Sequence, residues 1–120
     1  MRIVIIYLFY GAIDVKVMFT LLSLTAAALA LAADPEIAIT LRDHRFTPSE
    51  VAVPAGVKVK LVIDNQDDTA DEFESFTLNR EKVVFPKSKA IVFVGPLKPG
   101  RYEFIGEYHS ATAKGALVAQ

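Results

Sequence analysis

The sequence predicts an all-β protein whose strands form an antiparallel β-sandwich or barrel. Apolar and polar residues alternate in short runs from residue 34 to residue 120, and a period of two is typical of strands with one buried face. Proline, glycine and asparagine separate these runs, which favours short strands joined by turns. No run in this part of the sequence keeps the 3.6-residue apolar period of an amphipathic helix.

Residues 1–33 are predicted to be a signal peptide. The apolar run 18–33 ends in small residues that match the Ala-x-Ala pattern of a cleavage site. A second apolar run at 3–10 is unusual for a signal, so we expect translation to start further along than Met1. The alternative interpretation is an N-terminal membrane anchor. In either case residues 34–120 are expected to form one domain outside the cytoplasm.

Eight strands are expected in the domain. In the first of them Ile37, Ile39 and Leu41 share one face, which we expect to be buried. Turn signals such as Thr47-Pro48 and Pro99-Gly100 end the runs. The expected strands, in chain order, are 36–41, 50–53, 58–63, 73–78, 82–85, 90–94, 102–105 and 116–118.

Most of the aromatic side chains are expected in or near the core. The chain contains no cysteine, so a domain of fewer than 100 residues has no disulfide and depends on burying large apolar groups. The rings assigned to the core are Phe46, Phe73, Phe76, Phe85, Phe93, Phe104, Tyr102 and Tyr108.

Composition and motifs exclude several classes of function. The net charge is −1 with acids and bases interspersed, so the sequence lacks the basic patch that nucleic-acid binding requires. The absence of cysteine removes thiolate nucleophiles, zinc–thiolate sites and iron–sulfur clusters. There is no phosphate-binding loop and no G-x-S-x-G nucleophile motif, and no site for a small organic substrate is evident.

Five motifs occur in an order that resembles a known family. They are F-T-P-S-E-V-A-V-P-A-G (46–56), an apolar run ending in Asn65, D-E-F-E (71–74), P-G-R-Y-E-F (99–104) and G-A-L-V (115–118). In this order they resemble the cupredoxin-like domain over nearly all of residues 34–120. The resemblance implies a Greek-key β-sandwich that holds a metal at one end.

The sequence departs from the copper-binding members of that family at three of four ligand positions. Asp71 stands where the resemblance places the first histidine, Gly106 where it places the cysteine, and Ala113 where it places the methionine, so only His109 remains. A blue-copper centre requires the thiolate. The resemblance therefore implies a cupredoxin-like domain without a blue-copper centre.

The variant motifs resemble a cysteine-less subgroup found beside iron permeases in bacterial ferrous-iron uptake. The resemblance implies a periplasmic protein that handles iron, or assists its oxidation, for a membrane iron permease or another uptake component. The metal ligands that it implies are Asp71, Glu72, Glu74, Glu107 and His109. Carboxylates and imidazole suit Fe(II) or Cu(II) better than Cu(I), so we expect the bound ion to be iron or copper.

Other interpretations of the same residues stay open. The acidic side chains are also consistent with solvated charges paired to Arg80, Lys82 or Arg101. Two other functions are alternatives to iron handling: a metal-dependent ferroxidase in its own right, which needs oxygen or a partner to accept electrons, or a metal-free interaction module. His44 is expected to be a solvent-exposed loop histidine, with a remote ligand or partner contact as the alternative.

Overall fold

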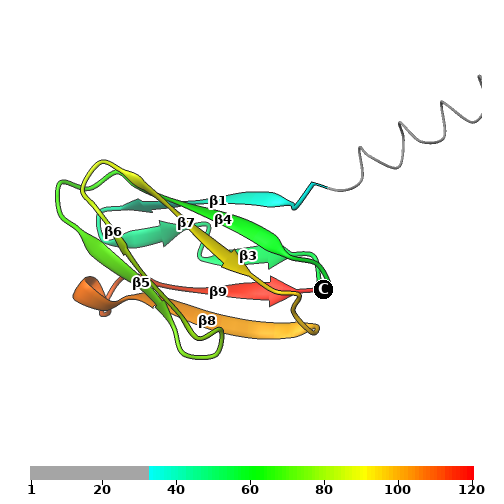
Figure 1. Ribbon diagram of the computed structural model, residues 1–120. Helices are drawn as coiled ribbons and strands as arrows, with labels where there is room; N and C mark the ends of the chain where they lie inside the picture. Colours follow the sequence, from blue (N-terminus) through cyan, green and yellow to red (C-terminus); the bar gives the residue numbers. More distant parts are fainter. Residues whose placement is uncertain (1–32) are drawn as a thin grey trace, which may run out of the picture. The chain divides into compact units, whose positions relative to one another are not determined.

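The computed structural model describes residues 33–120, which form a β-sandwich of nine strands. The predicted signal peptide lies outside the described residues except for Ala33. Figure 1 shows the strands running roughly along the long axis of the domain, with the single helical element near one end. The elements are β1 (Glu36–Arg42), β2 (Arg45–Thr47), β3 (Glu50–Val53), β4 (Val59–Asn65), β5 (Asp71–Ser75), β6 (Arg80–Val84), β7 (Lys89–Val94), β8 (Gly100–Gly106), the 3-10 helix η1 (Glu107–His109) and β9 (Lys114–Ala119).

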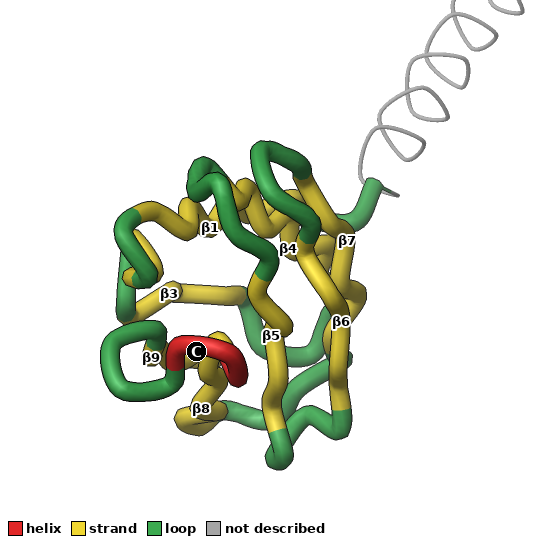
Figure 2. The backbone as a smooth tube through the Cα atoms, turned by 90° about the vertical axis from the view of Figure 1, so that its left-hand side faces the viewer, coloured by secondary structure: helices red, strands yellow, loops and turns green. Residues whose placement is uncertain are grey.

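Two sheets face each other across the core. The first has the order β2-β1-β4-β7 and the second the order β3-β9-β8-β5-β6. β1 pairs with β4 and β3 pairs with β9 in parallel, while the other pairs are antiparallel. The predicted all-β sandwich is confirmed, but both sheets are mixed rather than purely antiparallel. Figure 2 faces the end that carries η1, which lies at the front beside β8 and β9.

The core follows the alternation of the strands. β4 is the clearest case, because Val59, Leu61 and Ile63 are fully buried while the residues between them are partly exposed. Three aromatic rings, each from a different strand, form the centre of the core. The Phe104 ring lies 5.0 Å from the rings of both Phe46 and Phe73, measured between centroids. The Phe46–Phe104 contact is edge-to-face and the Phe73–Phe104 contact is tilted, and aromatic pairs of this kind stabilise the fold beyond the area that they bury.

Half of the predicted aromatic core is wrong. Phe46, Phe73 and Phe104 are buried and Tyr102 packs against the core. Four other rings are exposed, from 43 % to 81 % of their surface: Phe76, Phe85, Phe93 and Tyr108. The reason is their position. Phe93 stands on the outward face of β7, and the other three lie beyond strand ends, where no second sheet covers them.

Most predicted strands are close to the observed ones, but β2 and β5 differ most, and both differences affect the same end of the domain. β2 was not expected, because three residues are too short to show an alternating pattern. β5 begins at Asp71 and ends at Ser75, so the predicted strand 73–78 is displaced. The displacement hid a buried charge, since Asp71 is 1 % exposed and points inward with Phe73.

Residues 33–120 include no helix of the length and apolar character needed to cross a bilayer.

Candidate metal centre

His44 lies at the tip of a tight hairpin between β1 and β2. Arg42 pairs with Arg45, so Asp43 and His44 are the two central residues of the turn. Both have positive φ, 52° and 56°, as a type I′ hairpin requires. Aspartate and histidine adopt this left-handed conformation more readily than most side chains. The hairpin therefore presents the His44 ring at the end of the first sheet.

Asp67, in the loop between β4 and β5, fixes this turn. Its carboxylate accepts hydrogen bonds from the backbone amides of Asp43 (2.7 Å) and His44 (3.0 Å), and it lies 3.5 Å from Nδ1 of His44. The loop is itself held by the fully buried side chain of Asn65. Its Nδ2 donates hydrogen bonds to three backbone carbonyls, and its Oδ1 accepts one from the backbone amide of Asp67. Burial alone would raise the pKa of Asp67, but the amides of His44 and Asp43 outweigh burial and lower the pKa.

Asp71 holds the second histidine. Its Oδ2 lies 2.9 Å from Nδ1 of His109, and its Oδ1 accepts hydrogen bonds from the amides of Tyr108 (3.0 Å) and Glu72 (2.8 Å). The loop that carries η1 is closed at its base by the hydrogen bond from Gly106 N to the carbonyl oxygen of Ala113. Both oxygens of Asp71 are thus committed inside the protein.

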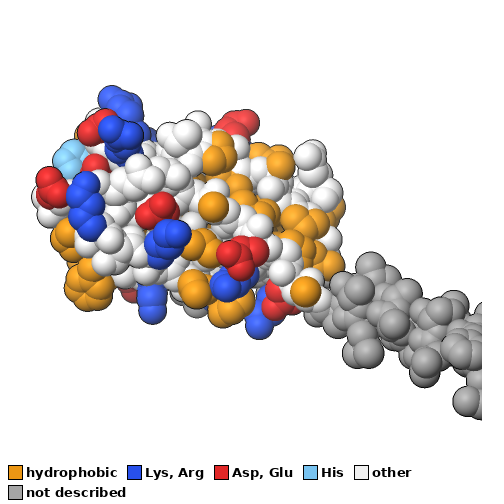
Figure 3. All heavy atoms as spheres, turned by 90° about the horizontal axis from the view of Figure 1, so that it is seen from above, with side chains coloured by type: hydrophobic (Ala, Val, Ile, Leu, Met, Phe, Trp, Pro, Cys, Tyr) orange, Lys and Arg blue, Asp and Glu red, His pale blue; other side chains and the backbone are white. Residues whose placement is uncertain are grey.

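The two histidines meet face to face. Their ring centroids are 3.7 Å apart and the ring planes differ by only 9°. Each ring has a carboxylate at Nδ1 and remains partly open to solvent, with 41 % of the His44 side chain and 28 % of the His109 side chain exposed. A histidine that ligates a metal usually has this kind of partner at its other ring nitrogen. Figure 3 shows a histidine among charged side chains at this end of the domain.

A second group of acidic side chains lies on the outer face of the second sheet. Glu74 is directly opposite Glu81 in the β5–β6 ladder, and Glu72 is the diagonal neighbour of Glu81. Carboxylate oxygens of Glu72, Glu81 and Glu107 all lie within 4.8 Å of one another. We call Glu72, Glu74, Glu81 and Glu107 the carboxylate cluster.

The cluster concentrates negative charge that nothing nearby neutralises. A hydrogen bond with Glu72 and the Glu72 charge raise the pKa of Glu81, and partial desolvation, a hydrogen bond with Glu107 and the neighbouring charges raise that of Glu74. A hydrogen bond to Glu72 also raises the pKa of Tyr108. Among residues 33–120, no lysine or arginine forms an ion pair with a cluster member.

The residues predicted as metal ligands fall into two groups. Asp71 and His109 belong with the His44 ring, whereas Glu72, Glu74 and Glu107 belong to the carboxylate cluster on the outer face. Glu72 and Glu74 are two residues apart on β5 and share its partly exposed face, as the alternating burial of the strand shows. Two of the three alternative counter-ions are engaged elsewhere: Arg101 pairs with Glu50 and Glu103, and Arg80 donates to backbone carbonyls.

Two residues of this end were missed in the sequence. His44 was expected to be a solvent-exposed loop histidine; its side chain is 41 % exposed in a turn, but its ring also stacks on His109. The Asn-Gly or Asp-Gly pair that usually marks such a turn is absent here, and the local sequence gives no partner for the ring. Glu81 was not singled out, because its neighbours in the cluster come from another strand and another loop.

The space available at Gly106 does not fit a blue-copper centre. A Cβ atom at this position would lie 2.6 Å from Oδ2 of Asp71 and 2.7 Å from Cβ of Ala113. The carboxylate therefore fills the volume that a ligand side chain at this position would occupy. With no cysteine in the chain and this volume filled, the residues at this end do not fit the ligand set of a blue-copper centre.

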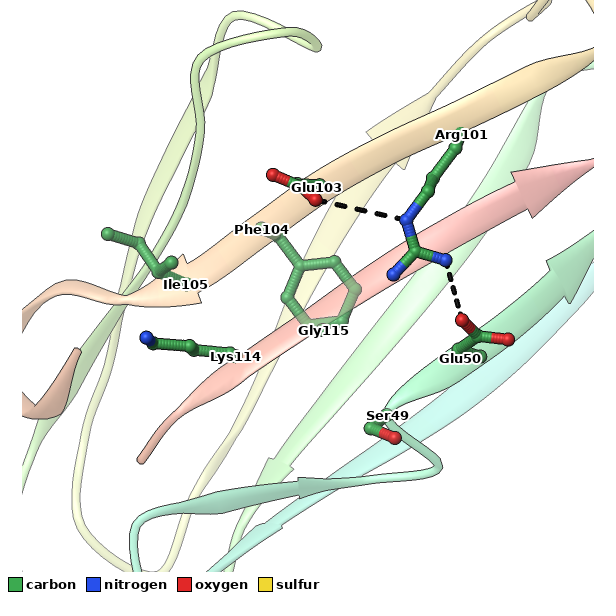
Figure 4. Close-up of a pocket in the computed structure, with 8 residues that line it drawn as sticks. All are labelled: Ser49, Glu50, Arg101, Glu103, Phe104, Ile105, Lys114 and Gly115. Carbon is green, nitrogen blue, oxygen red and sulfur yellow. Dashed lines mark hydrogen bonds and ion pairs between the residues drawn. The ribbon is translucent and has the colours of Figure 1, made fainter. Parts of the chain in front are cut away.

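A separate surface hollow of about 340 Å³ runs over β3, β8 and β9. Figure 4 shows Arg101 between Glu50 and Glu103, with the Phe104 ring beneath them. Arg101 Nη1 lies 2.6 Å from Glu50 and its Nε lies 3.8 Å from Glu103. The arginine is satisfied within the hollow, and none of the residues discussed above as ligands lines it.

Comparison with known proteins gives relatives in sequence and in fold. The chain is 47 % identical over 83 residues to an uncharacterised protein of Rickettsia prowazekii (strain Madrid E), a match that covers 69 % of this chain and 66 % of the relative. The fold is similar to auracyanin A, a "blue" copper protein from Chloroflexus aurantiacus (TM-score 0.63, 15 % identity, 73 % of this chain and 100 % of that chain).

A further structural relative is the metal-binding domain of the Cu(I)-exporting P-type ATPase CopA of Streptococcus pneumoniae D39 (TM-score 0.60, 14 % identity, 71 % of this chain and 84 % of that chain). At these identities the structural matches establish the fold alone. The family model of the cupredoxin-like domain matches residues 14–119, which is most of the sequence. The chain therefore belongs to the cupredoxin-like domain family.

Proposed function

We propose that the protein is a periplasmic metal-handling domain that binds ferrous iron, or Cu(II), and assists its oxidation or its transfer to a membrane iron permease. Binding is assigned to the end of the sandwich that carries Asp71, Glu72, Glu74, Glu107 and His109, and we add Glu81. The observation that carries the proposal is the close approach of the carboxylates of Glu72, Glu81 and Glu107, within 4.8 Å of one another and without a basic partner among residues 33–120.

The charge of the cluster supports binding of a hard cation. Carboxylate oxygens favour Fe(II) or Mn(II) over Cu(I), which prefers sulfur. The raised pKa values of Glu74 and Glu81 are signs of mutual repulsion, and a bound cation relieves that repulsion. Asp71 has a different role in this proposal. Because its oxygens are already hydrogen-bonded, it positions His109 instead of facing the ion.

Exposure of the cluster suits transfer rather than storage. Glu81 and Glu107 are exposed and Glu72 is half-buried, so a partner can approach a bound ion from solvent. The location and the permease partner are supported by the predicted signal peptide and by the motifs that resemble iron-uptake cupredoxins. Oxidation of Fe(II) releases one electron, and this step requires oxygen or a partner as the electron acceptor.

The test is anaerobic calorimetry of the purified protein with Fe(II), Mn(II), Cu(II) and Zn(II), compared with the Glu72→Gln/Glu107→Gln variant. We expect Fe(II) to bind with a dissociation constant well below about 1 mM, and we expect the variant to lose most of that affinity. Glu36→Gln is the matched control, since Glu36 is paired with Lys60 far from the cluster in sequence. Binding weaker than about 1 mM for every ion would overturn the proposal.

A further inference from the structure

We propose that the outer face of the first sheet is an interface for a second copy of this chain. The inference is independent of metal binding, because the residues proposed as ligands lie on β5, β6 and η1 and not on this sheet. Two observations carry it. An apolar row of side chains crosses three strands of this face, and the charges on either side of the row complement those of a copy turned by 180°.

The strand register arranges the outward side chains in three rows. Alternate residues of β1, β4 and β7 point away from the core, as the burial pattern of each strand shows. The β1–β4 and β4–β7 ladders place these residues side by side across the sheet. The first row is Glu36, Lys60 and Phe93, the middle row is Ala38, Val62 and Ile91, and the third row is Thr40, Asp64 and Lys89.

The middle row and Phe93 form one apolar surface. Ile91 and Phe93 are 46 % and 43 % exposed, Ala38 is exposed and Val62 is half-buried. Lys58 covers part of the Phe93 ring, with its Nζ 4.4 Å from the ring centroid. Figure 3 looks onto this side of the domain and shows hydrophobic side chains gathered across it. Apolar side chains that adjoin one another on a surface and are bordered by charges are typical of a protein interface.

The charges beside the apolar row favour a second copy as the occupant. Two acids, Glu36 and Asp64, and two bases, Lys60 and Lys89, border the row, so the face carries no net charge. An anionic membrane attracts surfaces with an excess of lysine and arginine, which this face lacks. Lys60 is paired with Glu36 at 3.1 Å, whereas Asp64 and Lys89 form no ion pair with residues 33–120. Balanced charges of both signs suit a surface that binds its own copy.

A two-fold axis along the middle row brings the two faces into register. Because this axis is perpendicular to the strands, the first row of one copy faces the third row of the other. Lys60 of each copy then faces Asp64 of the second copy, and Phe93 faces the long side chain of Lys89. Val62 and Ile91 face their own equivalents, as apolar side chains do where two sheets pack with aligned strands. An axis parallel to the strands would instead place Lys60 against Lys60.

This arrangement leaves the candidate metal centre open. The strands of the two copies run in opposite directions, so the ends that carry η1 lie at opposite ends of the dimer. Three short rows on three strands form a small interface, and small interfaces belong to weak, transient complexes. We therefore expect a dissociation constant of about 0.01–1 mM.

The experiment is sedimentation equilibrium of the purified protein and of two charge-reversal variants. Lys60→Glu and Asp64→Lys each place like charges against each other at both contacts of the dimer. We expect each variant alone to associate about 10-fold more weakly than the wild type. An equimolar mixture of the two variants should associate as the wild type does, because every dimer of unlike variants again has opposite charges at both contacts. Recovery on mixing cannot arise from a change in the stability of either variant.

Two further substitutions test the apolar row and the specificity of the charges. Ile91→Lys places two like charges at the axis and should abolish association. Lys114→Glu is the matched control, since it makes the same charge reversal on β9 of the second sheet and should leave association unchanged. Circular dichroism of each variant checks that the fold is intact.

The outcomes separate this inference from the proposed function. A monomer at every concentration up to about 1 mM would overturn the inference, and binding of that monomer to phosphatidylcholine vesicles would assign the face to lipid instead. Weakened association of both variants without recovery on mixing would overturn the axis proposed here. Glu72→Gln/Glu107→Gln should lose Fe(II) affinity and associate as the wild type does, so either idea can fail without the other.

Discussion

The imidazole pair and the carboxylate cluster lie at the same end of the domain but are organised in opposite ways. In the pair, each ring is held by a carboxylate that also bonds the backbone. In the cluster, four acidic side chains face one another without a basic partner among residues 33–120. Hydrogen bonds to aspartates hold the first region, while like charges accumulate in the second. We expect substitutions in the first region to act through lost hydrogen bonds and substitutions in the second to act through changed repulsion.

Of the substitutions at this end of the domain, we expect Asp71→Ala to lower the stability of the fold most. It leaves the part-buried amides of Glu72 and Tyr108 without an acceptor and releases the His109 ring. A fully buried unsatisfied donor costs about 1–3 kcal/mol and partial access to water reduces that cost, so we expect a total loss of about 2–4 kcal/mol in urea unfolding. Asp71→Asn, which keeps an oxygen acceptor, should lose less. Equal stability of Asp71→Ala and the wild type would show that these hydrogen bonds do not hold the loop.

Gly106→Ala should have the next largest effect. Its Cβ would contact Oδ2 of Asp71 at 2.6 Å and Cβ of Ala113 at 2.7 Å, so the loop or the carboxylate must shift. Overpacking of this kind costs about 1–3 kcal/mol, and the shift should also weaken Cu(II) binding. Gly56→Ala is the control, since it has a positive φ but open space around it. Because Gly106 has a φ of −90°, alanine meets no left-handed strain there, so unchanged stability of Gly106→Ala would show that Asp71 and Ala113 make room for the methyl group.

Asp67→Asn tests whether Asp67 holds the turn that carries His44, and we expect a smaller loss of stability than for the two variants above. The pKa of Asp67 is lowered in the folded state, so its carboxylate stabilises the fold above the unfolded value of 3.8 and this stability is lost as pH falls below it. We expect the variant to lose about 1 kcal/mol of its free energy of unfolding at pH 7. Its stability should also fall less steeply as the pH is lowered. Hydrogen exchange at the amides of Asp43 and His44 should be faster. Unchanged exchange would mean that the turn holds without Asp67.

Glu81→Gln should produce the smallest change, and in the opposite direction. The pKa of Glu81 is raised in the folded state, so its ionised form destabilises the fold above the unfolded value of 4.5, and the penalty disappears at lower pH. The variant should melt at a slightly higher temperature at pH 7 and at the same temperature below pH 4.5. Glu36→Gln, which removes an ion pair with Lys60, should show no such gain. A lower melting temperature at pH 7 would contradict mutual repulsion in the cluster.

The strands could be predicted because each has one face in a common core. In β4, the buried residues Val59, Leu61 and Ile63 alternate with partly exposed ones, and the same period gives most other strands. The parallel pairs could not be predicted, since alternation says which face is buried but not which strand is the neighbour. The exposed aromatic rings were wrongly assigned to the core, because composition does not show where a strand ends. Phe76, for example, follows Ser75, where β5 stops.

The candidate site was predictable only in part. The resemblance to cupredoxins singled out Asp71 and His109, and the structure brings these two into contact. It gave no indication of His44, whose ring reaches His109 through a turn and a loop that pattern analysis treats as separate. Nor did the run D-E-F-E indicate that its first residue is buried and its second half-exposed. That distinction depends on the position of β5 against η1 and not on local sequence.

The parallel pair of β3 and β9 has a consequence for folding kinetics. β3 lies at the sheet edge with β9 as its neighbour, and Glu50 is paired with Ala116 near the end of the chain. Closing so long a loop costs entropy before any contact forms, so such topologies fold on the order of milliseconds to seconds. During synthesis the second sheet stays incomplete until β9 has been made. Until then the edge of β8 that pairs with β9 has unpaired backbone hydrogen-bonding groups. The last strand thus sets the earliest moment at which the whole sandwich becomes resistant to proteases and to aggregation.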